Sequence, residues 1–418
     1  MKTFLLMVFA LGYAGIIFEH RLKINKAAIA LFMAILSWTA FFFCLKDPFL
    51  IKHHLQQFNI HLAHIAQIIF FLLGAMTIVE LIDSHKGFTI ITRLIRTQSK
   101  RKLLWLVAGF SFCLSAILDN LTTTILMVSL LRKLIDHHKE RFLLCCVIII
   151  AANAGGAWTP IGDVTTTMLW IGGQLSSLEI IKSLFFPSLF SLFIPLLYFS
   201  LQLRGKFTPA IKPVEQEEPG ARCILILGIL GLILVPILKA GTGLPPFMGI
   251  LSSLSLLWLI TEGLHRHDES RSHLRVPHIF KQIDISGILF FLGILLMISA
   301  LERTELLQNL AQWLSSYLKN LPIIALLIGI LSAIIDNIPL VAATMSMYPL
   351  AEFPIDHPLW LMIAYAAGTG GSLLIIGSSS GIILMNMEKI EFIQYLKKVS
   401  LPVFIGYLIG MGIYLFLR

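Results

Sequence analysis

One six-residue motif occurs twice in this chain, each time inside a long apolar run. Ser115–Asn120 reads Ser-Ala-Ile-Leu-Asp-Asn, and Ser332–Asn337 reads Ser-Ala-Ile-Ile-Asp-Asn. Residues 103–131 and 321–350 carry no charge except the aspartates of the motif, Asp119 and Asp336. An ionisable group at bilayer depth costs about 3 kcal/mol on insertion scales, so both aspartates are candidate functional groups. The repetition predicts a membrane protein built from a duplicated unit.

The composition supports this interpretation over a soluble or nucleic-acid-binding protein. Of the 418 residues, 57% are hydrophobic and 13% are charged, and the mean hydropathy is +0.86. These values are typical of an all-α polytopic membrane protein. The net charge of +9 does not indicate nucleic acid as a partner, because the basic residues lie in short loops between apolar runs. The five cysteines form no Cys-x-x-Cys pair, and we expect packing roles for them and no cofactor.

Apolar segments of about 20 residues predict the membrane spans. We expect them near 3–18, 27–45, 60–82, 103–131, 142–178, 183–203, 223–240, 245–261, 284–301, 321–350, 358–387 and 399–417. The stretch at 204–222 contains three prolines among charged residues, and it predicts a cytoplasmic linker between two halves, 1–203 and 223–418. The first segment has no Ala-x-Ala cleavage pattern, so we interpret it as a span and not as a signal peptide.

The loops at 83–102 and 132–141 are both strongly basic, which predicts that both are cytoplasmic. The 29 residues between them are too few for the roughly 40 that two full helical spans require. We therefore expect residues 103–131 to form a re-entrant hairpin that turns near Asp119, and residues 321–350 to form a second one. Each half then has five spans and one hairpin, so the halves have inverted topology and both termini are external. In this arrangement 24 of the 32 Lys and Arg residues are cytoplasmic.

The repeat extends to two glycine-rich segments. Ala151-Ala152-x-x-Gly155-Gly156 with Gly162 matches Ala366-Ala367-x-x-Gly370-Gly371 with Gly377. Glycine and proline weaken a helix, so we expect broken helices within 142–178 and 358–387. A broken helix exposes backbone carbonyls and half-helix ends, which transporters use as dehydrated cation sites.

The side chains near these breaks are hard oxygen ligands, which suit a small hard cation. The candidate ligands for a cation and a proton are Asp119, Asn120, Thr122, Thr123, Asn153, Thr159, Asp163, Thr165, Thr166, Asp336, Asn337, Ser378 and Ser379. Glu80 is a candidate for the proton path. Each of these residues also has a structural interpretation, since Asp and Asn cap helices and Thr and Ser bond helix carbonyls.

The sequence resembles the NhaD-type sodium/proton antiporters of the ion transporter superfamily. The resemblance covers nearly the whole chain, and its most specific segments are Phe71–Gly87, Leu118–Thr124 and Asn153–Thr166. It implies inverted repeats, two hairpins, elevator-like alternating access and exchange of sodium or lithium for protons in a cell inner membrane. It also implies that Asp119 and Asp163 are the ion-binding pair. The second-half counterpart of Asp163 is Ser378, so the two related sites need not bind equally.

Competition for the aspartates explains such exchange. Burial disfavours the charged form of a carboxyl group, whereas a nearby cation favours it. Sodium or lithium entering the site would therefore displace protons. The sequence leaves open the stoichiometry, the choice among sodium, lithium and potassium, and a homodimer.

Three other functions are alternatives to sodium/proton exchange. An arsenite exporter or a sodium-coupled dicarboxylate symporter of the same superfamily is the main alternative, although neither needs so many membrane carboxylates. An intramembrane aspartyl protease is a minor alternative, because Leu118 and Pro160 occupy positions where such proteases have tyrosine and glycine. The segment Gly377–Gly381 fits G-x-S-x-G, but it has no strand-turn-helix context. We therefore expect a carrier and not an enzyme.

Overall fold

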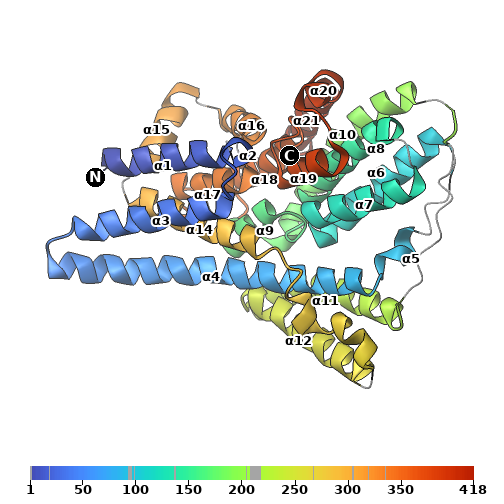
Figure 1. The fold of residues 1–418 in the computed structure, drawn as a ribbon. Coiled ribbons are helices and arrows are strands. Elements are labelled where there is room, and N and C mark those ends of the chain that lie inside the picture. The colour runs from blue at the N-terminus through green and yellow to red at the C-terminus, as the bar shows by residue number, and fades with distance from the viewer. Residues whose placement is uncertain are drawn as a thin grey trace.

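Helices make up most of the described chain in the computed structural model, and the described residues contain no named strand (Figure 1). The structure describes residues 2–17, 19–92, 97, 99–135, 138–203, 205–207, 218–266, 268–303, 306–318, 320–334 and 336–418. Most of the expected linker, residues 204 and 208–217, lies outside the described residues, so the domain boundary stays a prediction.

Eight of the described helices are long and apolar enough to cross a membrane. They are α3 (Lys26–Phe43), α4 (Pro48–Ser84), α6 (Lys100–Leu118), α10 (Ser177–Gln202), α11 (Ala221–Thr242), α12 (Pro246–His265), α14 (Ile285–Glu302) and α21 (Ser400–Leu417). The prediction of an all-helical polytopic membrane protein is confirmed at this level.

The remaining helices are shorter or interrupted. They are α1 (Lys2–Ile17), α2 (Glu19–Leu22), α5 (Phe88–Thr92), α7 (Asn120–Leu134), α8 (His138–Gly156), α9 (Val164–Ile171), the 3-10 helix η1 (Glu269–Leu274), α13 (Val276–Ile279), α15 (Leu306–Leu318), α16 (Leu321–Ser332), α17 (Asn337–Met347), α18 (Pro358–Gly370), α19 (Ser379–Glu388) and α20 (Phe392–Lys398).

Helix α4 is longer than the apolar run at 60–82 suggests. It begins at Pro48 with Asp47 as its N-cap, and it runs along much of the molecule in Figure 1. A proline is tolerated in the first turn of a helix, and the polar residues that follow do not interrupt it. Helix α14 contacts α4 and packs closely against α3, and Trp38 Nε1 on α3 donates a hydrogen bond of 2.9 Å to the carbonyl of Leu296 on α14.

The two Asp-Asn motifs lie at the ends of helices. Helix α6 ends at Leu118 and α7 begins at Asn120, so Asp119 alone separates them. Helices α6 and α7 contact one another, and both contact α8. In the second half α16 ends at Ser332 and α17 begins at Asn337. The re-entrant course of these hairpins through a bilayer stays a prediction.

Helix also stops at the two glycine-rich segments. Helix α8 ends at Gly156 and α9 begins at Val164, while α18 ends at Gly370 and α19 begins at Ser379. Close backbone contacts explain two of the glycines. A Cβ atom on Gly155 would lie 2.3 Å from the Phe112 carbonyl oxygen, and one on Gly370 would lie 2.3 Å from the Gly329 carbonyl oxygen. Only glycine allows helices to approach so closely.

The repeated serines make matching hydrogen bonds. Ser115 Oγ donates to the Ala152 carbonyl at 2.6 Å, and Ser332 Oγ donates to the Ala367 carbonyl at 3.0 Å. Each bond joins the first helix of an Asp-Asn pair to the helix that precedes the following glycine-rich break. The sequence repeat therefore coincides with a repeat of contacts.

Candidate functional site

Asp163 is the most highly connected carboxylate among the predicted site residues. It is the N-cap of α9, its side chain is buried, and Oδ1 accepts a hydrogen bond from Thr165 N at 3.0 Å. Oδ2 accepts bonds from Asn120 Nδ2 at 3.1 Å and from Asn337 Nδ2 at 3.4 Å. One carboxylate therefore contacts the amides of both Asp-Asn motifs.

Asn153 extends this network from the end of α8. Its Oδ1 accepts a hydrogen bond from Asn120 at 3.1 Å, and its Nδ2 lies 2.9 Å from Ser372 Oγ and 3.2 Å from Ser378 Oγ. Buried polar networks of this kind require every member to be satisfied, so they fix the relative positions of the elements that they join. Here they join the first half of the chain to the second.

Asp119 occupies an unfavourable backbone conformation. Its φ of 89° and ψ of 159° lie in a region that is almost confined to glycine, and a non-glycine residue there costs about 1–3 kcal/mol. Its carboxylate accepts bonds from Thr122 N at 2.7 Å and from Thr122 Oγ1 at 3.0 Å, which caps α7. An aspartate retained in a strained position next to a cavity is typical of a functional site.

A cavity of about 540 Å³ adjoins both aspartates. Its polar lining includes six of the predicted residues, namely Asp119, Asn120, Thr122, Asp163, Asn337 and Ser379. Apolar side chains from α4 and α14, such as Phe71 and Phe290, form much of the remaining wall. Four charged residues that were not predicted as ligands also line it, namely Glu19, Lys23, Lys26 and Asp284.

Asp336 makes different contacts from Asp119, its counterpart in the first motif. Its Oδ2 is 3.7 Å from Lys26 Nζ, and the carboxylate also caps α17 through the backbone of Ile338 at 3.4 Å. The Lys26 ammonium also lies 4.5 Å from the centre of the Phe290 ring. Asp336 is not among the residues that line the 540 Å³ cavity, although its neighbour Asn337 is. The second motif thus contributes its amide to the Asp163 network and its carboxylate to an ion pair.

The predicted hydroxyl ligands fall into two groups. Thr159 Oγ1 donates to the Ala116 carbonyl at 2.7 Å, Thr166 Oγ1 donates to the Asp163 carbonyl at 2.9 Å, and Ser378 Oγ accepts from Gly381 N at 3.2 Å. These three have structural partners. In contrast, the buried hydroxyls of Thr123 and Thr165 have no hydrogen-bond partner among the described residues. Neither of these two residues lines the cavity, so a ligand role for them stays a prediction.

Ser372 is a member of the network that the sequence did not indicate. Its hydroxyl accepts from Asn153, and its carbonyl accepts a bond of 2.7 Å from the hydroxyl of the buried Tyr395 on α20. The only feature of the sequence that could have indicated Ser372 is its position directly after Gly370-Gly371, the glycines at which the helix ends. Serine at a break is common in loops as well.

Glu80 lies in a second cavity, of about 430 Å³. This cavity shares Met76, Val79, Leu121, Thr122 and Asp284 with the first one, so the two are contiguous. Its other lining residues include Asp83, Lys86 and Lys133. Glu80 therefore lines a cavity that adjoins the aspartate-lined cavity and that other charged residues line as well.

The donor set suits sodium or lithium better than a transition metal. Within the described part of the chain, no group of three His, Cys, Asp or Glu side chains could hold a metal ion. The available ligands are two carboxylates with amide, hydroxyl and backbone oxygens, which hard cations prefer. The arrangement offers a site for a cation, and it offers no evident nucleophile with a base.

Comparisons with known proteins agree with a carrier. A family model described as citrate transporter matches residues 13–360. Sodium/proton antiporter 1 of Arabidopsis thaliana is 49% identical over 98% of this chain and 71% of its own length, and sodium/proton antiporter 2 of the same plant is 46% identical over 98% of both chains. The Na(+)/H(+) antiporter NhaD of Vibrio cholerae is 30% identical over 99% of this chain and 91% of its own.

These relatives match nearly the whole chain and are named as transporters, which indicates a multi-pass carrier that is not an enzyme. The chain belongs to the NhaD-type sodium/proton antiporters, and the citrate transporter family model matches it as well.

Proposed function

We propose that the protein exchanges sodium or lithium for protons across a membrane, and that Asp163 and Asp119 form the exchange site. The observation that carries this proposal is the position of the buried Asp163 carboxylate, which both Asp-Asn motifs contact beside a cavity that Asp119 also lines. The names of the relatives support sodium and protons as the ions, and lithium is added because its chemistry is similar.

Competition at the carboxylates couples the two ions. A protonated Asp163 is neutral and tolerates burial, whereas the ionised form needs a compensating cation. Sodium provides that charge and is coordinated by oxygens of Asp119, Asp163 and nearby amides and hydroxyls. Since the cation and the proton cannot occupy the same carboxylate together, each transport half-cycle carries one or the other.

We further propose that the halves are inverted repeats and that the hairpins move with the glycine-rich segments as one unit. The matching bonds of Ser115 and Ser332 support the repeat. Asn153 and Asn337 each bond a partner in the other half. These bonds would hold the hairpins and glycine-rich segments of the two halves together while they move, which supports their movement as one unit. The elements α3, α4 and α14 on the far wall of the cavity would then be the fixed frame.

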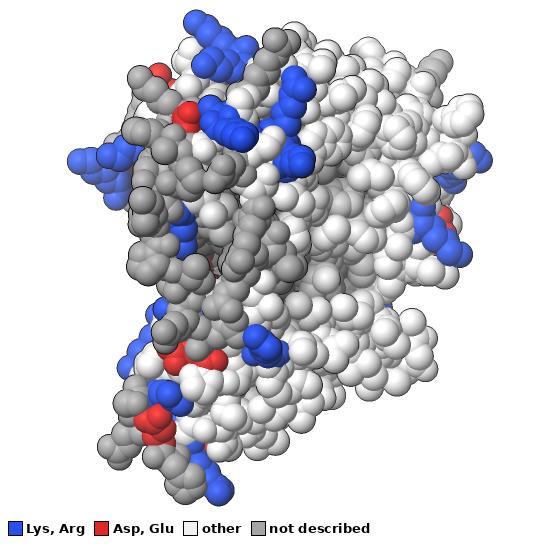
Figure 2. All heavy atoms as spheres, turned by 90° about the vertical axis from the view of Figure 1, so that its right-hand side faces the viewer, with Lys and Arg blue, Asp and Glu red and all other residues white. Residues whose placement is uncertain are grey.

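The basic loops give the proposed orientation. Figure 2 views the right-hand side of Figure 1, and Lys and Arg side chains are prominent on this face. With this face cytoplasmic, both termini are external and the protein lies in a cell inner membrane. Lys23, Lys26 and Asp284, which belong to or adjoin expected cytoplasmic loops, line the aspartate cavity. The cavity then opens towards the cytoplasm, and Glu80 in the adjoining cavity lies on a route for protons.

A citrate or dicarboxylate carrier is the second candidate, since the matching family model carries the citrate transporter description. An anionic substrate in the cavity would face Asp119 and Asp163 and would be repelled by both. Two lysines, Lys23 and Lys26, line the cavity, but Lys26 is paired with Asp336 and the carboxylates of Glu19 and Asp284 line the cavity as well. The charge of the site therefore favours cation exchange.

Reconstitution tests the proposal. Purified protein in liposomes with a trapped pH indicator should alkalinise or acidify the lumen when a sodium or lithium gradient is applied. Asp119→Asn and Asp163→Asn keep the side-chain shape and should abolish the response, while Asp47→Asn, which changes an exposed helix cap, should not. Sodium-driven proton movement in Asp163→Asn at the wild-type rate would contradict the assignment. Citrate uptake by the wild-type protein, with no sodium-driven proton movement, would favour the second candidate.

A further inference from the structure

A separate cavity of about 650 Å³ lies between α8, α10, α19 and α20. It shares no lining residue with the aspartate cavity. The lining residues that bear on its chemistry are His138, Phe142, Tyr198, Lys389, Lys397 and Lys398. It lies where α10 ends at Gln202, so it is at the level where a membrane-spanning helix leaves the apolar layer.

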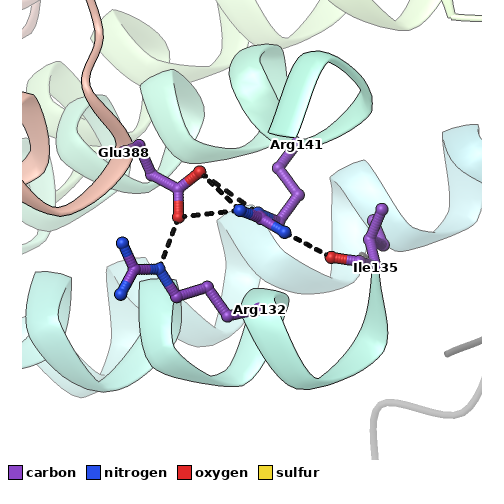
Figure 3. A network of polar contacts seen from close by, with 4 residues as sticks. All are labelled: Arg132, Ile135, Arg141 and Glu388. Atoms are coloured by element: carbon purple, nitrogen blue, oxygen red, sulfur yellow. Dashed lines mark hydrogen bonds and ion pairs between the residues drawn. The ribbon is translucent and has the colours of Figure 1, made fainter. Parts of the chain in front are cut away.

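The charge of this cavity is strongly positive because its one carboxylate is already neutralised. Glu388 accepts a bond of 2.7 Å from Arg132 Nε and bonds of 3.0 and 3.1 Å from Arg141 (Figure 3). Only 2% of the Glu388 side chain is exposed, and a buried charge of this kind requires its partners. Glu388 is therefore not free to neutralise the lysines of the cavity.

The three lysines are exposed and lack acidic partners. Among the described residues, none of the ammonium groups of Lys389, Lys397 and Lys398 lies within ion-pair distance of a carboxylate. Lys398 Nζ lies 5.5 Å from the centre of the Phe142 ring, which holds the ammonium towards α8. The helix that carries two of them is fixed, because Tyr395 is buried and bonds the Ser372 carbonyl at 2.7 Å.

The surroundings distinguish a lipid from a soluble anion. Ile393 and Leu396 on α20 are 52% and 40% exposed, and Leu201 on α10 is 64% exposed. These apolar side chains adjoin lining residues in sequence, and in a membrane protein they face acyl chains. Tyr198, also exposed, has the amphipathic character of residues at the headgroup level. Basic pockets between helices at this level suit phosphate headgroups.

We infer that this cavity binds the phosphate group of an anionic phospholipid, with Lys389, Lys397 and Lys398 contacting the phosphate and the exposed apolar residues of α10 and α20 contacting its acyl chains. The ion pairs of Glu388 hold α19 against α7 and α8, and Glu388 itself lines the site. This inference does not depend on the identity of the transported ions.

Native mass spectrometry of the detergent-purified full chain tests the inference. Phosphatidylglycerol should bind saturably and phosphatidylcholine with the same acyl chains should not. The triple variant Lys389→Gln, Lys397→Gln, Lys398→Gln should bind phosphatidylglycerol about a hundredfold more weakly. A matched triple variant, Lys46→Gln, Lys52→Gln, Lys182→Gln, removes three other exposed lysines and should bind like the wild type.

Three results would overturn the inference. Equal phosphatidylglycerol binding by the two triple variants would show that the lysines of the cavity are not the binding site. Equal binding of phosphatidylcholine would show that the phosphate charge is not recognised. Binding of inorganic phosphate without binding of phosphatidylglycerol would replace the lipid by a soluble anion.

Discussion

Asn337 Nδ2 lies 3.4 Å from Asp163 Oδ2, so an amide of the second half contacts the buried carboxylate of the first half. Asn120 contacts the same oxygen at 3.1 Å. The two asparagines therefore act alike, but the aspartates that precede them do not. Asp119 lines the cavity, whereas Asp336 forms an ion pair with Lys26.

This difference predicts coupling between Lys26 and Asp336. Only 23% and 14% of their side chains are exposed, so removing one partner leaves a partly buried charge without compensation. Lys26→Met and Asp336→Asn should each lower the thermal unfolding midpoint in detergent. The double variant should lose less than the sum of the two, with a coupling of about 1 kcal/mol. Additive losses would show that the pair contributes nothing.

The strained backbone of Asp119 predicts that a substitution can raise stability while it abolishes transport. Asp119→Gly relieves a cost of about 1–3 kcal/mol and, as a helix cap, loses only a few tenths. The variant should therefore unfold at a higher temperature than the wild type, and it should not exchange ions. Asp119→Ala keeps the strain and loses the cap, so it should unfold earlier. Equal destabilisation by both substitutions would argue against strain at this position.

The buried pair of His85 and His265 predicts a pH dependence of stability. Their Nε2 atoms are 3.0 Å apart, and His85 Nδ1 lies 2.8 Å from the Leu81 carbonyl. The carbonyl can only accept, so His85 Nδ1 donates to it, and when His85 is neutral its Nε2 accepts a hydrogen bond from His265 Nε2. His85 lies just beyond the end of α4, and its burial lowers its pKa to about 4.

The sign follows from the unfolded chain, in which histidine has a pKa of about 6.5. Below that pH the unfolded state binds a proton that the folded state does not, so the neutral pair stabilises the fold above pH 6.5 and loses this effect as the pH falls towards 4. Thermal midpoints should fall over this range, and His85→Gln should flatten the decline while lowering the midpoint at pH 7.5. An unchanged slope in His85→Gln would exclude the pair as its cause.

The hairpin at 103–131 predicts that its two ends face the same side of the membrane. Lys102 and Lys133 are exposed near the start of α6 and the end of α7. Single cysteines at these positions, in a variant without the five native cysteines, should both react with a membrane-impermeant reagent from the cytoplasmic side only. Labelling from opposite sides would mean that this segment crosses the membrane.

The sequence predicted most of the helices because apolar runs without charge have few alternatives in a bilayer. It did not predict the first turns of α4 or the helix α15, since their polar residues carry no span signal. The Asp-Asn motifs and the glycine-rich segments indicated the cluster around Asp163, and six of the predicted residues line its cavity.

The contacts of individual side chains were less predictable. The partner of Asp336 is Lys26, which lies in another part of the chain and looks like an ordinary loop cation. Thr159 and Thr166 bond backbone carbonyls, a choice that residue type leaves open. Which oxygens face a cavity depends on tertiary packing and not on local pattern.

The most direct test of the account is proton release on sodium binding. Purified wild-type protein in weakly buffered detergent should release protons when sodium is added, with a saturable dependence on sodium and a larger release at lower pH within the active range. Asp163→Asn and Asp119→Asn should release none, and Asp47→Asn should behave like the wild type. Saturable sodium binding without proton release in the wild-type protein would contradict competition for these carboxylates.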